Sequence, residues 1–404
     1  MRILHVINQF SGRAGAEVSL RELILATHEE VDHGVVVLGQ ENNEFSPLES
    51  TGTEIFVPDV ARPGWRRKVT HVRRAIRSFE PDVVHTALFD ADVSGRLAAR
   101  IARVPVVTSL VNMPWASQAS GAASRAQWVK HRLIRRADRT LARHATTHFH
   151  AVARTVSEAS SAALGVDPSH FTVVHRGRSD AHLGRRTAVR SRVARSALLE
   201  EIGRKGNPTL MLTVGREEPQ KNHLALLDAL DALVARGHDV LLVVAGRRGS
   251  ASGAIDEKIA GLGLGGNVAR LGVRHDIPEL LAAADVFVFP SLYEGAAGAV
   301  LEAMALEVPI VGSNIPALEE ALDHGRCGIL VDLGAPRSLA DAIERCAEGG
   351  PDVEGRVARA RQRFEEEYEL AAVADSMVCM YESVCRGQRT RGAAPLWRPR
   401  LCTW

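Results

Sequence analysis

The sequence has few cysteines, few aromatic residues and no long apolar run. Its five cysteines are an odd number without a Cys-x-x-Cys pair, which excludes a disulfide framework and a zinc ribbon and is typical of a reducing cytoplasm. Aromatic residues make up 4% of the chain and no recognition module is visible, so nucleic-acid binding is not expected. The longest uncharged run, residues 104–124, contains Pro105, Asn112 and Pro114 and would be a poor membrane span.

Metal-binding and targeting patterns are also missing. The 16 histidines form no His-Glu-x-x-His group, so no metal site is predicted. Residues 1–10 carry one arginine and no small-residue cleavage site, which predicts a first β-strand rather than a signal peptide. We therefore expect a cytoplasmic protein, and contact with the inner face of the membrane stays open.

Charge is unevenly distributed along the 404 residues. The net charge is +2, but residues 1–206 sum to +10 and residues 207–404 to −8. A chain of this length is expected to form two or three domains, and the charge division suggests two with different partners. Only 5 of the 50 basic residues are lysines, so each lysine is a candidate for a specific role.

Short β-branched runs alternate with amphipathic helical segments throughout, which predicts parallel α/β layers. We expect thirteen strands, at Ile3–Asn8, Val35–Gly39, Glu54–Val57, Asp82–His85, Val104–Leu110, Thr147–Val152, Thr172–His175, Thr209–Val214, Val240–Ala245, Val268–Leu271, Val286–Phe289, Ile310–Gly312 and Ile329–Val331. Ligands of open α/β sheets bind beyond the carboxyl ends of the strands, so two doubly wound units would face each other across a binding cleft.

Composition predicts the following organisation. Residues 1–183 form a first domain, the Arg-rich segment 184–206 a linker, and residues 207–368 a second domain. The long helical stretch 353–386 ends the folded part, and residues 387–404 show no periodicity and are expected to be a disordered tail.

The strongest functional pattern lies after the strand Val286–Phe289. It reads Ser-Leu-Tyr-Glu294-Gly-Ala-Ala-Gly-Ala-Val-Leu-Glu302 and leads from a loop of small residues into a helix. Small side chains let phosphates approach backbone N–H groups, and a helix N-terminus favours negative charge. Glu302 is suited to bind two sugar hydroxyls and Glu294 to stabilise positive charge on an anomeric carbon. The alternative is a strand–loop–helix connection without a ligand, in which both carboxylates are solvated.

A second pattern follows the strand Thr209–Val214. Val-Gly-Arg216-Glu-Glu-Pro-Gln-Lys221-Asn places two cations on a loop before a helix. Two cations there are suited to neutralise a departing diphosphate. The alternative is a solvated loop in which Glu217 and Glu218 pair with these cations.

Together these residues resemble glycosyltransferase family 4. The two glutamates with seven residues between them match that family's signature, the Arg216–Lys221 segment resembles its diphosphate loop, and Arg270-Leu-Gly-Val273-Arg274 its base-binding turn. The resemblance covers nearly the whole chain. It implies an α/β fold of the GT-B type, two doubly wound Rossmann-like domains with a C-terminal helix (369–386) that crosses back to the N-terminal domain.

The resemblance also implies a reaction and its residues. Family members are retaining enzymes that use a nucleotide sugar as co-substrate, without a further cofactor or metal. Arg216, Lys221 and Glu294 would form the catalytic set. The implied donor-binding set contains these three residues together with Gly15, Val273, Arg274, Gly295, Ala297, Gly298, Ala299 and Glu302.

The N-terminal half departs from the family pattern at three places. The glycine-rich loop after the first strand reads Arg-Ala14-Gly15-Ala-Glu17, with alanine for one glycine. Val111 stands where many members carry a histidine near the donor sugar, and His175-Arg176-Gly-Arg178 stands where many read Pro-Asn-Gly. These departures are interpreted as marks of a subfamily.

We therefore predict a glycosyltransferase acting on a hydroxyl of a glycan, lipid-linked or small-molecule acceptor. The basic segment 124–145, with seven Lys or Arg against one Asp, is a candidate for contact with an anionic membrane or acceptor, and a core-packed surface helix is the alternative. A nucleotide-sugar epimerase of the same fold and a non-catalytic scaffold descendant remain as other functions.

Overall fold

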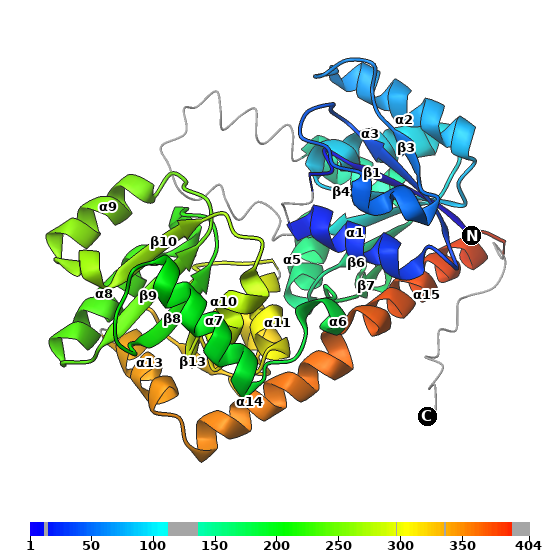
Figure 1. Ribbon diagram of the computed structural model, residues 1–404. Coiled ribbons are helices and arrows are strands. Elements are labelled where there is room, and N and C mark those ends of the chain that lie inside the picture. Colours follow the sequence, from blue (N-terminus) through cyan, green and yellow to red (C-terminus); the bar gives the residue numbers. More distant parts are fainter. Residues whose placement is uncertain (12–14, 112–135, 296, 335–336, 390–404) are drawn as a thin grey trace. The chain divides into compact units, whose positions relative to one another are not determined.

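The computed structural model describes residues 1–11, 15–111, 136–295, 297–334 and 337–389. The chain forms two compact units (Figure 1). The first contains Met1–Val152, Val156–Val174 and the chain from Ala374 onward, and the second contains Ala153–Thr155 and His175–Val373. Each unit is a parallel sheet with flanking helices, so the predicted α/β class is confirmed.

The first unit is built on a seven-stranded parallel sheet in the order β3-β2-β1-β4-β5-β6-β7. Its strands are β1 (Arg2–Ile7), β2 (Asp32–Val37), β3 (Glu54–Phe56), β4 (Val83–Ala87), β5 (Val106–Leu110), β6 (His148–Ala151) and β7 (Phe171–Val173). Its helices are α1 (Gly15–Thr27), α2 (Trp65–Phe79), α3 (Phe89–Ala102), most of α5 (Arg154–Leu164) and most of α15 (Leu370–Arg389). All seven strands predicted for this half are present, within three residues at each end.

A row of polar side chains crosses this sheet from strand to strand, and we call it the histidine row. It consists of His33, His5, His85, Ser109 and His150, one from each of β2, β1, β4, β5 and β6, all buried. Successive members are hydrogen-bonded at 3.0, 2.9, 2.6 and 2.6 Å. Burial lowers the pKa of His33 to about 4 and that of His85 to about 3, and it lowers the pKa of His5 as well.

The ends of the histidine row are tied to the rest of the unit. Thr27 of α1 bonds His33 at 2.9 Å, and the carbonyl oxygen of Val174 lies 2.8 Å from Nε2 of His150. The Tyr381 hydroxyl of α15 lies 3.2 Å from Nδ1 of His85. Burying an imidazole without hydrogen bonds costs free energy, and in this row the side chains bond one another, so the row links five strands and the last helix.

The second unit is built on a six-stranded parallel sheet in the order β10-β9-β8-β11-β12-β13. Its strands are β8 (Thr209–Val214), β9 (Val240–Ala245), β10 (Val268–Gly272), β11 (Val286–Phe289), β12 (Ile310–Ser313) and β13 (Ile329–Val331). Its helices are α6 (Asp180–Leu183), α7 (Ala188–Glu201), α8 (His223–Ala235), α9 (Ser252–Gly261), α10 (Ile277–Ala283), α11 (Gly298–Ala305), α12 (Pro316–Ala321), α13 (Ser338–Glu348) and α14 (Pro351–Arg363).

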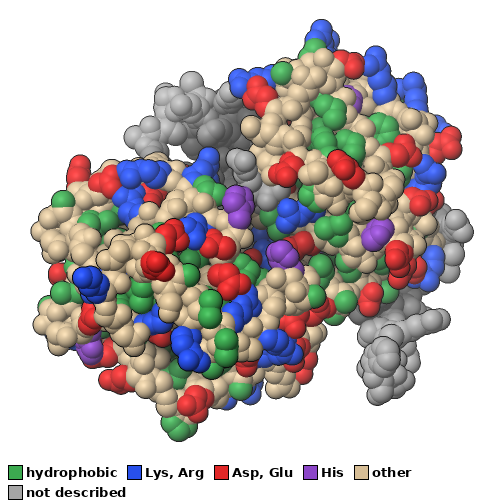
Figure 2. Space-filling view, in the orientation of Figure 1, with side chains coloured by type: hydrophobic (Ala, Val, Ile, Leu, Met, Phe, Trp, Pro, Cys, Tyr) green, Lys and Arg blue, Asp and Glu red, His purple; other side chains and the backbone are tan. Residues whose placement is uncertain are grey.

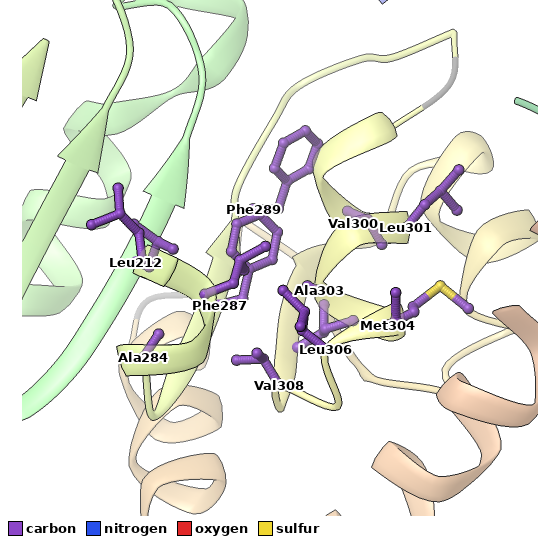
Figure 3. Close-up of a cluster of buried hydrophobic side chains, with 14 of the residues drawn as sticks. Leu212, Ala284, Phe287, Phe289, Val300, Leu301, Ala303, Met304, Leu306 and Val308 are labelled. Atoms are coloured by element: carbon purple, nitrogen blue, oxygen red, sulfur yellow. The ribbon is translucent and has the colours of Figure 1, made fainter. Parts of the chain in front are cut away.

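Both faces of the second sheet are buried. In β11, Phe287 and Phe289 belong to one core cluster, whereas Val286 and Val288 belong to the cluster on the other face. Figure 3 shows the first cluster, in which α11 packs through Val300 and neighbouring apolar residues against the two phenylalanines of β11. This alternation explains why the strands read as continuous apolar runs.

The strand order of each sheet reverses at one point. In the second unit the reversal lies between β8 and β11, because β9 and β10 extend the sheet on one side and β12 and β13 on the other. Such a switch point opens a crevice at the carboxyl ends of its two strands. The loops after β8 and β11 carry the two patterns that the sequence singled out, so the fold brings both to one place.

The unit boundaries differ from the predicted domains. The chain enters the second unit at His175 rather than after residue 183. The predicted linker 184–206 contains α7, whose Ala194 and Leu198 pack in the core of the second unit, so this segment is part of that unit. Its many arginines suggested a solvated linker, but several of them bond carbonyl groups within the unit, as Arg186 does with Ala284.

The final helical stretch is broken. The α14 helix ends in a π-helical turn, Phe364–Tyr368, and Glu369 is extended before α15 begins. Glu369 forms a parallel bridge with Arg178, which replaces helical hydrogen bonds at this point. From Ala374 onward α15 belongs to the first unit, as the fold prediction required. Residues 387–389 of the predicted tail are helical, and residues 390–404 lie outside the described part.

None of the described helices is long and apolar enough to cross a membrane. On the face seen in Figure 2, acidic and basic side chains are interspersed over the second unit. Many of them are paired, for example Arg236 with Asp341 and Glu344.

Candidate active site

The loop after β8 presents Arg216 and Lys221. It begins at Gly215, directly after β8, and Gly246 directly after β9 lies close to it. A Cβ on Gly246 would lie 1.8 Å from the Gly215 carbonyl oxygen. Glycine is therefore required at position 246. Arg216 is exposed, and its side chain makes no hydrogen bond or ion pair with another described residue. The alternative in which this loop's own carboxylates pair with its cations is not observed, because Glu217 pairs with Arg270 and Glu218 accepts a bond from Ser250.

Lys221 and Glu294 form the central pair of the site. The Lys221 Nζ atom lies 2.7 Å from Oε1 of Glu294, and it also lies 4.5 Å from the centre of the Phe289 ring. Only 19% of the lysine side chain and 10% of the glutamate side chain are exposed. Residues 73 positions apart in sequence thus form a largely desolvated ion pair at the switch point.

The second glutamate is also paired. Glu302 lies in α11, and its Oε1 accepts a 2.8 Å bond from Nε of Arg178. Arg178 further donates to the Gly177 carbonyl oxygen at 2.9 Å. A Cβ on Gly298 would lie 2.4 Å from Nη2 of Arg178, so this guanidinium is packed against the first residue of α11. Gly295 and Ala297 are buried, and Gly298 and Ala299 are half-buried.

In the predicted base-binding turn, the Val273 side chain is exposed and the Arg274 side chain is hydrogen-bonded. Val273 is 59% exposed. The Arg274 guanidinium bonds both Asp276 and Glu201, and these hydrogen bonds raise the pKa of Arg274. The Arg274 side chain is therefore paired within its own unit.

Two predictions for the first half fall partly outside the described residues. In the loop after β1, residues 12–14 lie outside the described part, whereas Gly15 begins α1 and the buried Glu17 accepts a 2.9 Å bond from the Ser11 amide.

Of the basic segment 124–145, residues 124–135 lie outside the described part and residues 136–145 are helical. Two of its cations, Arg139 and Arg143, are exposed and both bond the Leu164 carbonyl oxygen, so they stabilise the first unit.

Comparisons with known proteins identify the family. The family model described as Glycosyltransferase Family 4 matches residues 13–181, and the model described as Glycosyl transferases group 1 matches residues 208–348. The UDP-Gal:alpha-D-GlcNAc-diphosphoundecaprenol alpha-1,3-galactosyltransferase of Escherichia coli is 27% identical over 82% of this chain and 84% of its own length. The chain is a family 4-like glycosyltransferase.

Further relatives support the family and the fold of this glycosyltransferase. The phosphatidyl-myo-inositol mannosyltransferase of Mycolicibacterium smegmatis is 35% identical over 47% of this chain and 49% of its own length. The crystal structure of HepE from Anabaena in complex with UDP and glucose superposes with a TM-score of 0.79 at 22% identity, covering 95% of this chain and all of that one. The two-domain GT-B prediction is confirmed.

The sequence singled out most of the residues that meet at the switch point of the glycosyltransferase, but it did not assign Arg176 and Arg178 to the site. Arg178 holds Glu302, 124 positions away. Arg176 lies close enough to Arg178 and Glu294 for their charges to act on it. Their departure from the family's Pro-Asn-Gly was the one available signal, and only the fold shows what these side chains approach.

Proposed function

We propose that this glycosyltransferase moves a sugar from a nucleoside diphosphate donor to a hydroxyl group, with retention of anomeric configuration. The observation that carries the proposal is the Lys221–Glu294 pair, set with Arg216 at the carboxyl ends of β8 and β11. A diphosphate needs cations and helix N-terminal amides, and a sugar cation needs a carboxylate. Support comes from the presence of both kinds of group in the loops after β8 and β11.

Each residue has a proposed role. Arg216 and Lys221 neutralise the departing diphosphate, and Glu294 lies beside the donor sugar. Glu302, oriented by Arg178, binds the nucleotide ribose. Backbone groups of Gly295, Ala297, Gly298 and Ala299 meet the sugar and phosphate, and those of Val273 and Arg274 meet the base.

The proposed reaction is mainly electrostatic. The bond between the anomeric carbon and the diphosphate oxygen breaks, and a bond to the acceptor oxygen forms on the same face of the sugar. The acceptor proton passes to the departing diphosphate, which needs no side-chain base and agrees with valine at position 111. The catalytic contribution of the protein is to hold charges in place before they develop.

The donor assignment predicts specific ligand effects. A thermal-shift panel of UDP, GDP, ADP and dTDP should contain at least one ligand that raises the melting temperature, because a ligand bound only by the folded state stabilises it. Glu302→Ala should weaken that ligand about 10- to 100-fold, as expected for loss of a charge-assisted hydrogen bond. Glu279→Ala is the matched control, since Glu279 also pairs with an arginine at 2.8 Å but on the surface.

Two results would contradict this proposal. One is a wild-type protein that none of the four nucleotides stabilises. The other is release of a new free nucleotide sugar without any acceptor, which would indicate an epimerase.

We further propose an anionic, lipid-linked acceptor, which would place the reaction at a membrane surface. Support comes from the positive half of the sequence and from the lipid-linked acceptors named for two relatives. Raising the ionic strength from 0.05 to about 0.5 M should then weaken use of a diphospholipid acceptor more than binding of the donor nucleotide, because exposed charges are screened more strongly than half-buried ones. Equal salt sensitivity of the two would contradict this acceptor assignment.

A further inference from the structure

Arg176 is a half-buried arginine without a counter-ion. Its Nε atom is inaccessible to solvent and has no hydrogen-bond partner, and no ion pair joins its guanidinium to any other described residue. Burial and the positive charge of Arg178 lower the pKa of Arg176 to about 10, against the opposing effect of Glu294. The side chain therefore stays charged at neutral pH, in a place that disfavours its charge.

The charges around it leave Arg176 uncompensated. Both carboxylates of the site are already engaged, Glu294 with Lys221 at 2.7 Å and Glu302 with Arg178 at 2.8 Å. The two remaining cations are Arg176 and Arg216. Arg178 moreover packs against the first residue of α11, where the helix dipole adds further positive character.

A positive charge at a partly desolvated position such as that of Arg176 is unfavourable unless an anion joins it. The diphosphate of a nucleotide sugar carries two negative charges and would balance the two unpaired guanidinium groups. A guanidinium is also suited to bind phosphate oxygens in a bidentate manner, which a lysine cannot do.

We propose that Arg176 binds the diphosphate of the donor, as a third cationic residue beside Arg216 and Lys221. This inference rests on the proposed function, because it names a further residue of the same donor site. It assigns a role to the segment His175–Arg178, in which this chain departs from Pro-Asn-Gly. In this assignment Arg178 is a positioning residue for Glu302, whereas Arg176 contacts the substrate.

The test compares Arg176→Gln, Arg176→Lys and the wild type. Calorimetry with UDP, GDP, ADP and dTDP first identifies the nucleoside diphosphates that bind the wild type. Arg176→Gln should weaken these about 10- to 100-fold, and Arg176→Lys should weaken them less, because it keeps the charge without the bidentate geometry. The melting temperature of the ligand-free Arg176→Gln protein should not fall, since the variant removes an unpaired charge.

Arg185→Gln is the matched control. Arg185 belongs to the same unit, is 60% exposed and pairs with Glu365 on the surface, so its removal changes the net charge equally. Arg185→Gln should bind the nucleotides like the wild type, which separates a local contact from a general charge effect.

The outcomes are distinct. Unchanged nucleotide affinity in Arg176→Gln overturns the assignment and leaves the proposed function intact. A lowered melting temperature with unchanged affinity shows a structural role. Failure of all four nucleotides to bind the wild type overturns the proposed function itself and this inference with it.

Discussion

Lys221→Ala is expected to lower kcat/KM for sugar transfer by about 10²- to 10³-fold, the range seen when one preorganised group that stabilises transition-state charge is removed. Lys221 is held by Glu294 at 2.7 Å and packs over Phe289, so it is preorganised before the substrate arrives. Because negative charge on the diphosphate grows as the sugar bond breaks, kcat should fall more than donor affinity.

Two variants make this test interpretable. Lys258→Ala removes a lysine that pairs with Asp228 at 2.6 Å on the surface of the same unit, and it should leave kcat/KM unchanged. The double variant Lys221→Ala/Glu294→Ala shows how much of the loss comes from a carboxylate left without its counter-ion. Activity within threefold of the wild type in Lys221→Ala would contradict the diphosphate role.

Acidification from pH 6.5 to 5 is expected to destabilise the first unit by about 1.5 kcal/mol for each member of the histidine row that stays neutral in the folded state. The pKa values of His33 and His85, about 4 and about 3, lie below the value near 6.5 of an unfolded chain, and that of His5 is lowered as well. The unfolded state thus binds more protons below pH 6.5. The contribution of these histidines to the free energy of unfolding is therefore fully present above pH 6.5 and is lost as the pH falls toward 4.

Tryptophan fluorescence can follow this unit selectively, because the sequence contains no tryptophan between residues 175 and 373. Urea unfolding at pH 7, 6 and 5 should show a steep loss for the wild type. His33→Gln should show a shallower one, since glutamine does not titrate, and His144→Gln, at an exposed position of the same unit, should behave as the wild type. Parallel pH dependences of His33→Gln and wild type would refute this explanation.

The sequence allowed all thirteen strands to be placed, because each is a short β-branched or apolar run between turn residues. Such a run can be recognised from the local sequence alone. The switch-point loops could be found for a similar reason, since Arg216, Lys221, Glu294 and Glu302 lie in local patterns. The extended conformation of Glu369 could not be predicted, because it depends on pairing with Arg178 across 191 positions. The place of Arg176 in the site and the contacts of the histidine row could not be predicted either. In both cases the residues that meet come from separate segments and share no regular spacing.

Residues 184–206 show the limit of composition as a guide. An arginine-rich segment with glycines normally indicates a solvated connection. Here Arg195 bonds Asp285, and Ala194 and Leu198 fill the core, so the segment is structural. Arginine is long enough to reach buried carbonyl and carboxylate groups while its stem covers apolar surface, which composition alone does not reveal.

The division of the first unit into separate stretches of chain has a consequence for synthesis on the ribosome. Val373, Met377, Met380 and Tyr381 of α15 are buried, and the last three lie in the helix segment that belongs to the first unit. Translation of residues 175–373 takes about 10 to 40 s at 5–20 residues per second. During that interval the nascent first unit lacks the helix whose Tyr381 contacts His85, whereas the second unit has all of its residues once Val373 has been added. The second unit is therefore synthesised in full before the first, and a nascent chain stalled before residue 374 would expose an unfinished sheet to chaperones.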